Sequence, residues 1–331
     1  MLYDTSRLEP CVADARPSWR KGRQSATVSS AARVIECSSI VDDFYSSLLD
    51  WSGQHLFYSV ENVVHCYDFH TEKSARVYAN AGTSIPCLKQ SVELNALCVG
   101  TSCGQLHVVD LYTGRTTRFN HHKSRIGTLE TFGGCVATGS RDRRVKIIDV
   151  RERSPVAVLE AHTQEVCGVA MNSRKDLIAS GGNDNRVYVF DIRRTAQPLV
   201  MLADHSAAIR ALSWSPAMPQ QLVTGGGTAD RTLRQWDLGK KSPLIKAEKF
   251  DSQICNARWL RNGRVLCTFG YSQDDARLLN DMCVERQFVG HKSRVIHLGV
   301  DPKERYFATG SGDGTVRIWE LEREPIDIKI R

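Results

Sequence analysis

An acidic or amide residue recurs at a nearly constant interval along the 331-residue chain, and this interval constrains the fold more than any other feature. Neighbouring members of the series are 39 to 46 residues apart: Asp68, Asp110, Asp149, Asp191, Asp237, Asn280 and Glu320. The interval fits a four-stranded blade of a β-propeller and exceeds the length of common helical repeats, about 34 residues. Seven repeats predict an all-β protein with seven blades, and a ring of six or eight blades is the alternative.

The last repeat carries a recognisable set of side chains. His291 precedes the first apolar run, Asp313 lies in a tight turn, and Trp319 comes near the end of the final run. A buried histidine can connect a hydroxyl group with an indole, while an aspartate in the turn accepts hydrogen bonds from the histidine and the backbone. We therefore expect structural roles in WD40-type blades for these residues and for two similar sets: His162, Asp184 and Phe190, and His205, Asp230 and Trp236.

A propeller must close so that its first and last blades leave no unpaired strand edge between them. In the repeat pattern, each unit's fourth strand is followed by the next unit's first three, so Glu320 leaves the last blade without an outer strand. The segment from Ala32 to Cys37 precedes the first blade, and we expect it to supply this strand. The chain then divides into a flexible basic N-terminal arm (1–31), one propeller (32–321) and a C-terminal tail (322–331).

The composition indicates an intracellular protein that binds neither nucleic acid nor membranes. A net charge of +7 is modest for this length, and the sequence lacks the basic run with interleaved aromatic residues that is typical of single-strand binders. The eleven cysteines include Cys66, Cys98, Cys135 and Cys267, never form a C-x-x-C pair and read as reduced core residues. No signal peptide heads the chain, and no apolar run approaches the length of a membrane span.

Motifs of catalysis are missing from the sequence. It contains no H-E-x-x-H, no G-x-S-x-G and no phosphate-binding loop, since the run Gly225-Gly226-Gly227 lacks the following lysine. The ten histidines are spread over the repeats, so packing within blades explains them better than metal binding. We therefore expect a protein that is not an enzyme and that has no cofactor and no metal.

Several strings are more specific than the general blade pattern: Arg33 to Glu36, Val41 to Tyr45, Leu48 to Ser52, His162 to Gly168, Ser180 to Asn185, and Gly270 to Gln273. In these strings the chain resembles the Fizzy and Fizzy-related coactivators of the anaphase-promoting complex, a ubiquitin ligase, and the resemblance extends over roughly residues 33 to 320. It implies a receptor that holds degradation motifs of cell-cycle proteins and delivers them to the ligase, which performs the chemistry. Whether the chain is of the Fizzy or the Fizzy-related branch stays open.

The resemblance places a receptor site for the KEN motif (Lys-Glu-Asn) on six positions that keep the family's residue types: Asp43, Asn183, Asn185, Thr228, Gln253 and Arg294. The carboxylate of Asp43 suits the lysine of the motif, and the guanidinium of Arg294 suits its glutamate. These residues come from different repeats, so we expect the turns on one face of the ring to bring them together. Taken singly, Asn183 and Asn185 could instead be turn residues.

The family's groove for the destruction box (R-x-x-L) lies between the first and last blades, and the resemblance places it on Ile35, Glu36 and Tyr67. Glu36 replaces the usual aspartate and keeps the negative charge for the arginine of the motif. Gly314 stands where the family often has a glutamate. We expect this to weaken binding without abolishing it, because surface ion pairs are worth about 0–1 kcal/mol. For Ile35, core packing is the alternative role.

Docking to the ligase is implied at Ile330 and Arg331, which offer an apolar anchor and a guanidinium with a free carboxylate to a tetratricopeptide-repeat groove. The family's N-terminal D-R-(F/Y)-I-P box is matched only by the arginine and proline of the segment from Ser6 to Pro10, which could be a degenerate version. The implied partners are subunits of the anaphase-promoting complex, degron-bearing proteins such as cyclins and securin, and checkpoint proteins. The expected location is the nucleus and cytoplasm.

Two other functions stay open at this point. One is a WD40 scaffold or decoy that keeps the peptide-binding face without activating the ligase. The other is a general WD40 module for unrelated peptides. Binding of a KEN peptide and ubiquitination of a KEN-bearing protein would separate these possibilities.

Overall fold

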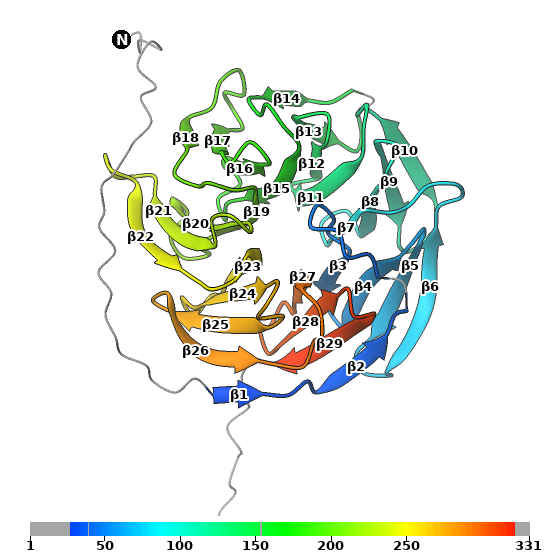
Figure 1. Ribbon diagram of the computed structural model, residues 1–331. Helices are drawn as coiled ribbons and strands as arrows, with labels where there is room; N and C mark the ends of the chain where they lie inside the picture. Colours follow the sequence, from blue (N-terminus) through cyan, green and yellow to red (C-terminus); the bar gives the residue numbers. More distant parts are fainter. Residues whose placement is uncertain (1–26, 39, 153, 322–331) are drawn as a thin grey trace, which may run out of the picture.

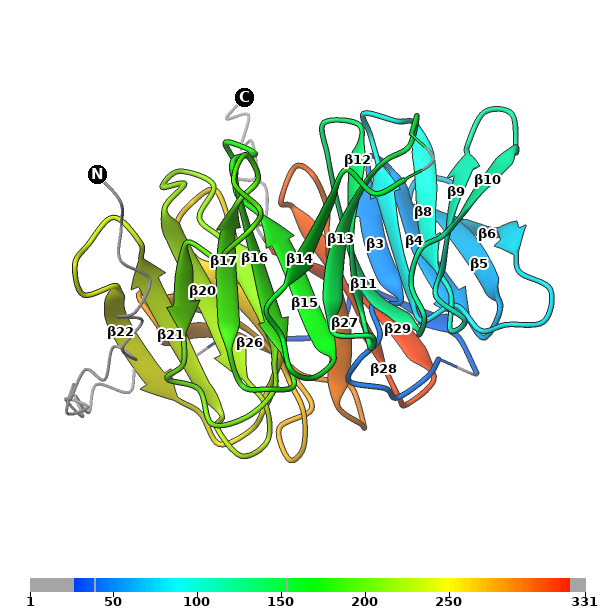
Figure 2. The same cartoon turned by 90° about the horizontal axis from the view of Figure 1, so that it is seen from above.

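A computed structural model describes residues 27–38, 40–152 and 154–321, and these form a ring of seven blades around a central channel (Figure 1). Each blade is an antiparallel sheet of four strands, and one blade carries a fifth. Seen at right angles to this view, the blades stand side by side and their connecting loops gather at the two faces of the ring (Figure 2). The predicted all-β propeller with seven blades is confirmed.

The first four blades each use four strands that are consecutive in the chain. Blade one is β3 (Leu49–Ser52), β4 (His55–Val60), β5 (Val63–Asp68) and β6 (Lys73–Ala79). Blade two is β7 (Cys87–Ser91), β8 (Ala96–Gly100), β9 (Gln105–Asp110) and β10 (Thr116–Asn120). Blade three is β11 (Ile126–Phe132), β12 (Cys135–Ser140), β13 (Arg144–Asp149) and β14 (Ala157–Glu160). Blade four is β15 (Val166–Met171), β16 (Leu177–Gly182), β17 (Val187–Asp191) and β18 (Val200–Leu202).

The last three blades include the two strands from the start of the described chain. Blade five is β19 (Ile209–Trp214), β20 (Gln221–Gly226), β21 (Thr232–Asp237) and β22 (Leu244–Lys249). Blade six is β23 (Ile254–Trp259), β24 (Val265–Phe269), β25 (Ala276–Asn280), β26 (Cys283–Phe288) and, outermost, β1 (Thr27–Ser29). Blade seven is β27 (Val295–Val300), β28 (Tyr306–Ser311), β29 (Thr315–Glu320) and β2 (Arg33–Glu36).

The repeated acidic or amide residue ends the third strand of every blade. Its role is clear in blade one, where Asp68 Oδ1 accepts the backbone N–H groups of His70 and Thr71 at 2.9 and 2.7 Å. Asp110 does the same in blade two. A short acidic side chain that accepts from the next two or three N–H groups stabilises a tight turn, which explains why this residue type marks the period.

The ring closes through the segment predicted for this purpose. β2 pairs antiparallel with β29, with Arg33 opposite Ile318 and Glu36 opposite Thr315, and so becomes the outer strand of blade seven. The structure adds a strand that was not expected: β1 pairs parallel with β26 on blade six. Both strands follow the outside of the ring (Figure 1). The described part of the propeller therefore includes residues 27–29, which the prediction assigned to the N-terminal arm. Three residues in parallel pairing are too few to show a periodic pattern in the sequence.

Apolar side chains pack between neighbouring blades. Between blades five and six, for example, Val223 and Leu233 share a cluster with Phe250, Trp259 and Phe269. Burial of such side chains is the main stabilising contribution in a fold whose blades have no separate cores. Among the described residues, none forms a helix with the length and apolar character needed to cross a membrane.

A buried hydrogen-bond network fixes the turn between the second and third strands in four blades. In blade seven, His291 Nδ1 donates to Asp313 at 2.9 Å, and Nε2 accepts from the hydroxyl of Thr309 at 2.8 Å. The indole of Trp319 donates to the same hydroxyl at 2.7 Å. Burial lowers the pKa of His291, which favours the neutral imidazole. The set predicted for blade five forms an equivalent network with Thr224. In blade four, His162 bonds Asp184 and the hydroxyl of Ser180, while Phe190 takes the place of the indole without a hydrogen bond. A further set was missed in blade three: His122, Thr138 and Asp142.

Candidate functional site

One face of the ring carries the residues directly before the innermost strands and the turns between second and third strands; we call it the upper face. Five of the six residues predicted to bind a KEN motif belong to it by their place in the blades. Gln253 directly precedes β23, and Arg294 directly precedes β27. Asn183 and Asn185 lie in the turn between β16 and β17, and Thr228 lies in the turn between β20 and β21.

The sixth residue, Asp43, belongs to residues 40–48, which connect β2 with β3 and enter the centre of the ring (Figure 1). We call them the crossing segment. Its backbone is tied to the blades on either side of blade one: Ser47 N–H donates to Pro86 O, before blade two, at 2.8 Å, and Leu48 N–H donates to His297 Nδ1 of blade seven at 3.3 Å. Phe44 packs with Cys255 and Ile296. The crossing segment therefore partly closes the channel at the upper face.

A buried arginine holds the crossing segment in place. Arg210, 6% exposed, donates from Nη1 to the carbonyls of Cys255 (2.6 Å) and Ile296 (2.7 Å) and from Nη2 to the carbonyl of Ser46. Burial lowers the pKa of Arg210 to about 10, so the guanidinium stays charged at neutral pH. One side chain thus joins blades five, six and seven to the crossing segment.

Asp43 and Asn183 meet in one polar cluster. Asp43 forms an ion pair with Arg125 at 2.8 Å, and Arg125 also makes a two-pronged contact with Glu165 at 2.7 and 3.1 Å. The phenol of Tyr45 donates to Asn183 Oδ1 at 3.0 Å, and the guanidinium of Arg125 lies 5.2 Å from the Tyr45 ring centre. Burial raises the pKa of Tyr45, so its hydroxyl remains a donor. The sequence placed only two members of this cluster.

Arg294 is held by the residue next to Asp43. Its Nε donates to Asp42 Oδ1 at 2.5 Å, and its Nη2 donates to the Asp42 backbone carbonyl at 2.8 Å. The guanidinium also lies 5.6 Å from the ring centre of Tyr271, whose side chain is 61% exposed. Arg294 is therefore oriented over the crossing segment and beside an accessible aromatic ring.

Thr228 and Gln253 form a third contact. The hydroxyl of Thr228 donates to Gln253 Oε1 at 2.6 Å, and Gln253 Nε2 lies 3.5 Å from the Cys255 sulfur. Asn185 has a backbone φ of +63°, in the left-handed region that asparagine tolerates better than most residues. The turn alone thus accounts for Asn185, whereas Asn183 is not among the residues with positive φ and is selected by no such requirement.

The residues implied for a destruction-box groove lie at the junction of blades one and seven. Ile35 packs against an apolar cluster that contains Tyr67, Val316 and Ile318. Tyr67 is 6% exposed and its hydroxyl lies 3.5 Å from Arg33 Nη1, whereas Glu36 is exposed at the end of β2. Of the three, Glu36 is exposed, Ile35 is partly buried and Tyr67 is buried. Core packing accounts for Ile35.

Gly314 has a structural reason to differ from a glutamate. Its φ is +78°, and it follows Asp313 in the turn as Asn185 follows Asp184 and Arg231 follows Asp230, all with positive φ. A side chain is possible at this position, since Arg231 provides one, but it adopts a strained backbone. Ile330, Arg331 and the segment from Ser6 to Pro10 lie outside the described residues.

Arg125 and Glu165 could have been found from the repeat itself. Both directly precede an innermost strand, as do Gln253 and Arg294. In blades three, four and seven, the residue at this position comes three residues after the histidine of the buried network. The sequence prediction did not recognise the histidine of blade three, and so it missed this constant spacing. The four residues line the upper mouth of the channel: Arg125, Glu165, Gln253 and Arg294.

This arrangement suits the binding of a short polar peptide. The mouth offers carboxylates on one side, a guanidinium on another, and amide and hydroxyl groups between them. Each charged group already has an internal partner, so a peptide must replace existing contacts and does not meet unpaired charges. Among the described residues, no group of His, Cys, Asp and Glu could hold a metal ion.

Comparisons with known proteins agree with one another. A family model described as CDC20/Fizzy WD40 domain matches residues 35–319. "Protein FIZZY-RELATED 2" of Arabidopsis thaliana is 32% identical over 300 residues, which cover 88% of this chain and 62% of that protein. "APC/C activator protein CDH1" of Saccharomyces cerevisiae is 35% identical over 312 residues, covering 88% of this chain and 52% of the relative.

A third relative and a solved structure extend the likeness. "WD repeat-containing protein srw1" of Schizosaccharomyces pombe is 33% identical over 340 residues, and the match covers 97% of this chain and 58% of that protein. A chain of the solved structure "Crystal Structure of Mitotic Checkpoint Complex" superposes with a TM-score of 0.86 at 25% identity, covering 96% of this chain and 100% of that one. The matched part spans between 52% and 62% of these three relatives.

Proposed function

The chain belongs to the CDC20/Fizzy family of WD40 proteins, and from this premise we propose that it is a substrate receptor and coactivator of the anaphase-promoting complex. In this proposal the propeller binds KEN and destruction-box motifs of cell-cycle proteins and performs no chemistry. Its contribution to ubiquitin transfer is to hold the substrate near the ligase, which raises the effective concentration of the reacting groups. The names of its relatives, among them an APC/C activator, support this role.

The observation that carries the proposal is that Asp43 and Arg294 both lie at the crossing segment: Asp43 belongs to it, and Arg294 binds the preceding residue, Asp42. Asn183 is joined to the crossing segment by its hydrogen bond with Tyr45. In the proposed complex, the lysine of the KEN motif pairs with Asp43 and its glutamate pairs with Arg294. Thr228 and Gln253 then serve its asparagine and backbone.

The destruction-box site is proposed on the junction of blades one and seven. There Glu36 supplies a solvent-facing carboxylate for the arginine of R-x-x-L, and the cluster around Ile35 and Tyr67 supports the strand that carries it. Ligase docking is proposed for Ile330 and Arg331, in a tetratricopeptide-repeat groove. Checkpoint proteins are proposed as further partners, and the likeness to a chain of a mitotic checkpoint complex supports this. The proposed location is the nucleus and cytoplasm.

A binding experiment tests the receptor. Fluorescence polarisation of a labelled KEN peptide is compared for the unaltered protein, Arg294→Gln and Asp43→Asn, with Arg115→Gln as control because Arg115 is exposed in blade two. We expect each site variant to weaken binding about tenfold or more, since a charge-assisted hydrogen bond is worth about 1.5–3 kcal/mol. The control should bind as the unaltered protein does. No saturable binding by a folded protein would contradict the proposal.

The pairing of charges is tested by a double-mutant cycle. A peptide with glutamine in place of the KEN glutamate is combined with Arg294→Gln. If the KEN glutamate contacts Arg294, the second change should cost little further binding free energy once the first is made. Additive losses of binding free energy would mean that Arg294 contacts another part of the peptide. A matched cycle combines Asp43→Asn with an uncharged replacement of the lysine.

Coactivation needs a separate assay. In a reconstituted ubiquitination reaction with the anaphase-promoting complex, we expect the protein to promote modification of a KEN-bearing substrate, and Arg294→Gln to reduce it. Peptide binding without any ubiquitination would favour the scaffold or decoy over the coactivator.

A further inference from the structure

The channel holds a second pocket beneath the crossing segment. It has a volume of about 500 Å³, with Ser47 and Arg210 among its lining residues, and it extends to the turns after the innermost strands, at residues such as Pro216 and Pro302. The volume lies within the range of small-ligand pockets, about 300–1,000 Å³. The pocket is thus separated from the proposed KEN site by the crossing segment.

The wall of this pocket has one ring of residues in equivalent register, one from the innermost strand of each blade. The register is defined by strand pairing. Each ring residue lies opposite an apolar residue of the second strand, and that residue in turn lies opposite the third-strand position two residues before the repeated acidic or amide residue. Four members are charged: Asp50, Lys89, Glu130 and Arg258 of blades one, two, three and six. The other three are small: Ala170, Ser213 and Gly299 of blades four, five and seven.

The four charges are unevenly satisfied. Lys89 pairs with Asp50 at 3.3 Å, and Asp50 also accepts the Gln90 backbone N–H at 2.8 Å. Glu130 accepts only the backbone N–H of Thr131 (3.0 Å) among the described residues. Asp50 and then Glu130 raise the pKa of Lys89, while burial and Arg258 oppose them, so all three charges lie within electrostatic reach of its ammonium group.

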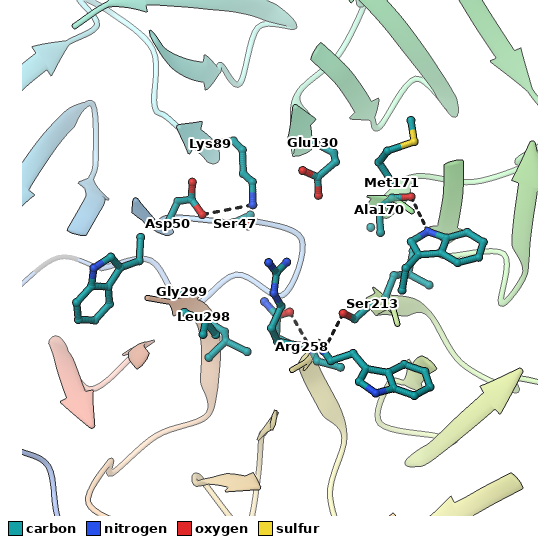
Figure 3. Close-up of a pocket in the computed structure, with 18 of the residues that line it drawn as sticks. Ser47, Asp50, Lys89, Glu130, Ala170, Met171, Ser213, Arg258, Leu298 and Gly299 are labelled. Atoms are coloured by element: carbon teal, nitrogen blue, oxygen red, sulfur yellow. Dashed lines mark hydrogen bonds and ion pairs between the residues drawn. The ribbon is translucent and has the colours of Figure 1, made fainter. Parts of the chain in front are cut away.

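Arg258 is the isolated member of the ring. It is exposed and makes no ion pair with any described residue. The ring positions of the two adjacent blades are Ser213 and Gly299, which are too short to cover it. Figure 3 shows Lys89, Glu130 and Arg258 pointing into the same open centre. Glu130 and Arg258 thus face the centre from blades three and six, and no ion pair joins these two described residues.

From this arrangement we propose that the pocket binds a small zwitterionic ligand with a free carboxylate and a free amine, as in an amino acid or a short peptide. The planar guanidinium of Arg258 takes the carboxylate in two parallel hydrogen bonds. Glu130 takes the ammonium group, and Lys89 stays paired with Asp50.

The span between the two charged groups is measured with unblocked glycine peptides of one to four residues, whose only charges are at their ends. Binding to the full chain is followed by isothermal titration calorimetry and ligand-observed NMR. We expect one length to bind best, with a dissociation constant of about 1 mM or lower. The same length with an acetylated amine or an amidated carboxylate should bind at least tenfold more weakly. A protein that binds no member of the series contradicts the proposal.

Variants locate the binding in the pocket. Arg258→Gln and Glu130→Gln should each abolish saturable binding, while Arg115→Gln, outside the pocket, should leave it unchanged. The exchange of both charges, Arg258→Glu with Glu130→Arg, should restore binding with the peptide reversed, and a merely structural role would not produce this rescue. Peptide binding that survives both single variants would place the ligand elsewhere. KEN binding is unaffected in each case, so the two sites are tested independently.

Discussion

Arg294 donates from Nε to the carboxylate of Asp42 at 2.5 Å and from Nη2 to its backbone carbonyl at 2.8 Å, so an arginine before blade seven is fastened to the segment that crosses the channel. The two side chains are 21% and 31% exposed. If Arg294 takes the glutamate of a KEN motif, that glutamate must compete with Asp42. The resting site therefore contains its own anionic partner.

Replacement of Asp42 by asparagine should increase the affinity for a KEN peptide. The amide keeps a hydrogen-bond acceptor for Arg294 but removes the competing charge. We expect binding about fivefold tighter, because a partly exposed ion pair is worth about 1 kcal/mol. Fluorescence polarisation at low and high salt checks this, and the gain should shrink as salt rises. Weaker binding would mean that Asp42 orients Arg294 more than it competes with the peptide.

Arg210 should be a determinant of both stability and peptide binding. Arg210→Met keeps much of the volume but leaves the carbonyls of Ser46, Cys255 and Ile296 without their donor. We expect the free energy of unfolding to fall by about 3 kcal/mol or more, since several buried acceptors lose a charged partner. Urea denaturation measures this, with Arg115→Met as the exposed control. KEN affinity should fall as well, and unchanged affinity would show that the crossing segment holds its position without Arg210.

Loss of a hydroxyl from a buried blade network should lower the free energy of unfolding more than loss of an exposed hydroxyl. Thr309→Val preserves the shape of the side chain but removes the hydroxyl that joins His291 and Trp319. Two buried polar groups then lack a partner, so we expect a loss of about 3 kcal/mol in the free energy of unfolding. Thermal and urea denaturation measure it, with Thr117→Val, on the exposed side of blade two, as control. Similar losses in both variants would argue against the network as the cause.

The stability of the propeller should decrease as the solution becomes mildly acidic. Burial and the charge of Arg210 lower the pKa of His297 to about 3, whereas an unfolded histidine has a pKa of about 6.5. Between these values only the unfolded chain binds the proton. The free energy of unfolding therefore falls as pH decreases through this window, by up to about 1.4 kcal/mol per pH unit for one such group.

The contribution of His297 can be separated with His297→Gln, which cannot take up the proton. Urea denaturation at steps between pH 7 and 4.5 should give a shallower dependence for the variant than for the unaltered protein. His205 and His291, whose pKa values are also lowered by burial, keep part of the slope with the same sign. Parallel curves would show that His297 is not the group that titrates.

Local patterns allowed much of the fold to be predicted. In the first five blades the aspartate that ends the third strand accepts a backbone N–H of its own turn, so Asp68 and its four aspartate equivalents mark the period without help from the rest of the chain. Closure by β2 followed from counting strands. The parallel pairing of β1 with β26 could not be predicted, because a three-residue strand has no periodicity and its partner lies far away in the sequence.

The candidate site was likewise predicted only in part. The resemblance to a family placed Asp43, Asn183 and Arg294. It did not reveal that Arg125 joins Asp43 to Glu165, or that Asp42 binds Arg294. Those contacts join residues between 40 and 252 positions apart. The sequence by itself determined the number of blades, because turns and strands follow from neighbouring residues. Only the tertiary structure decided which charges meet at the channel, because closing the ring brings the ends of seven separate blades to one axis.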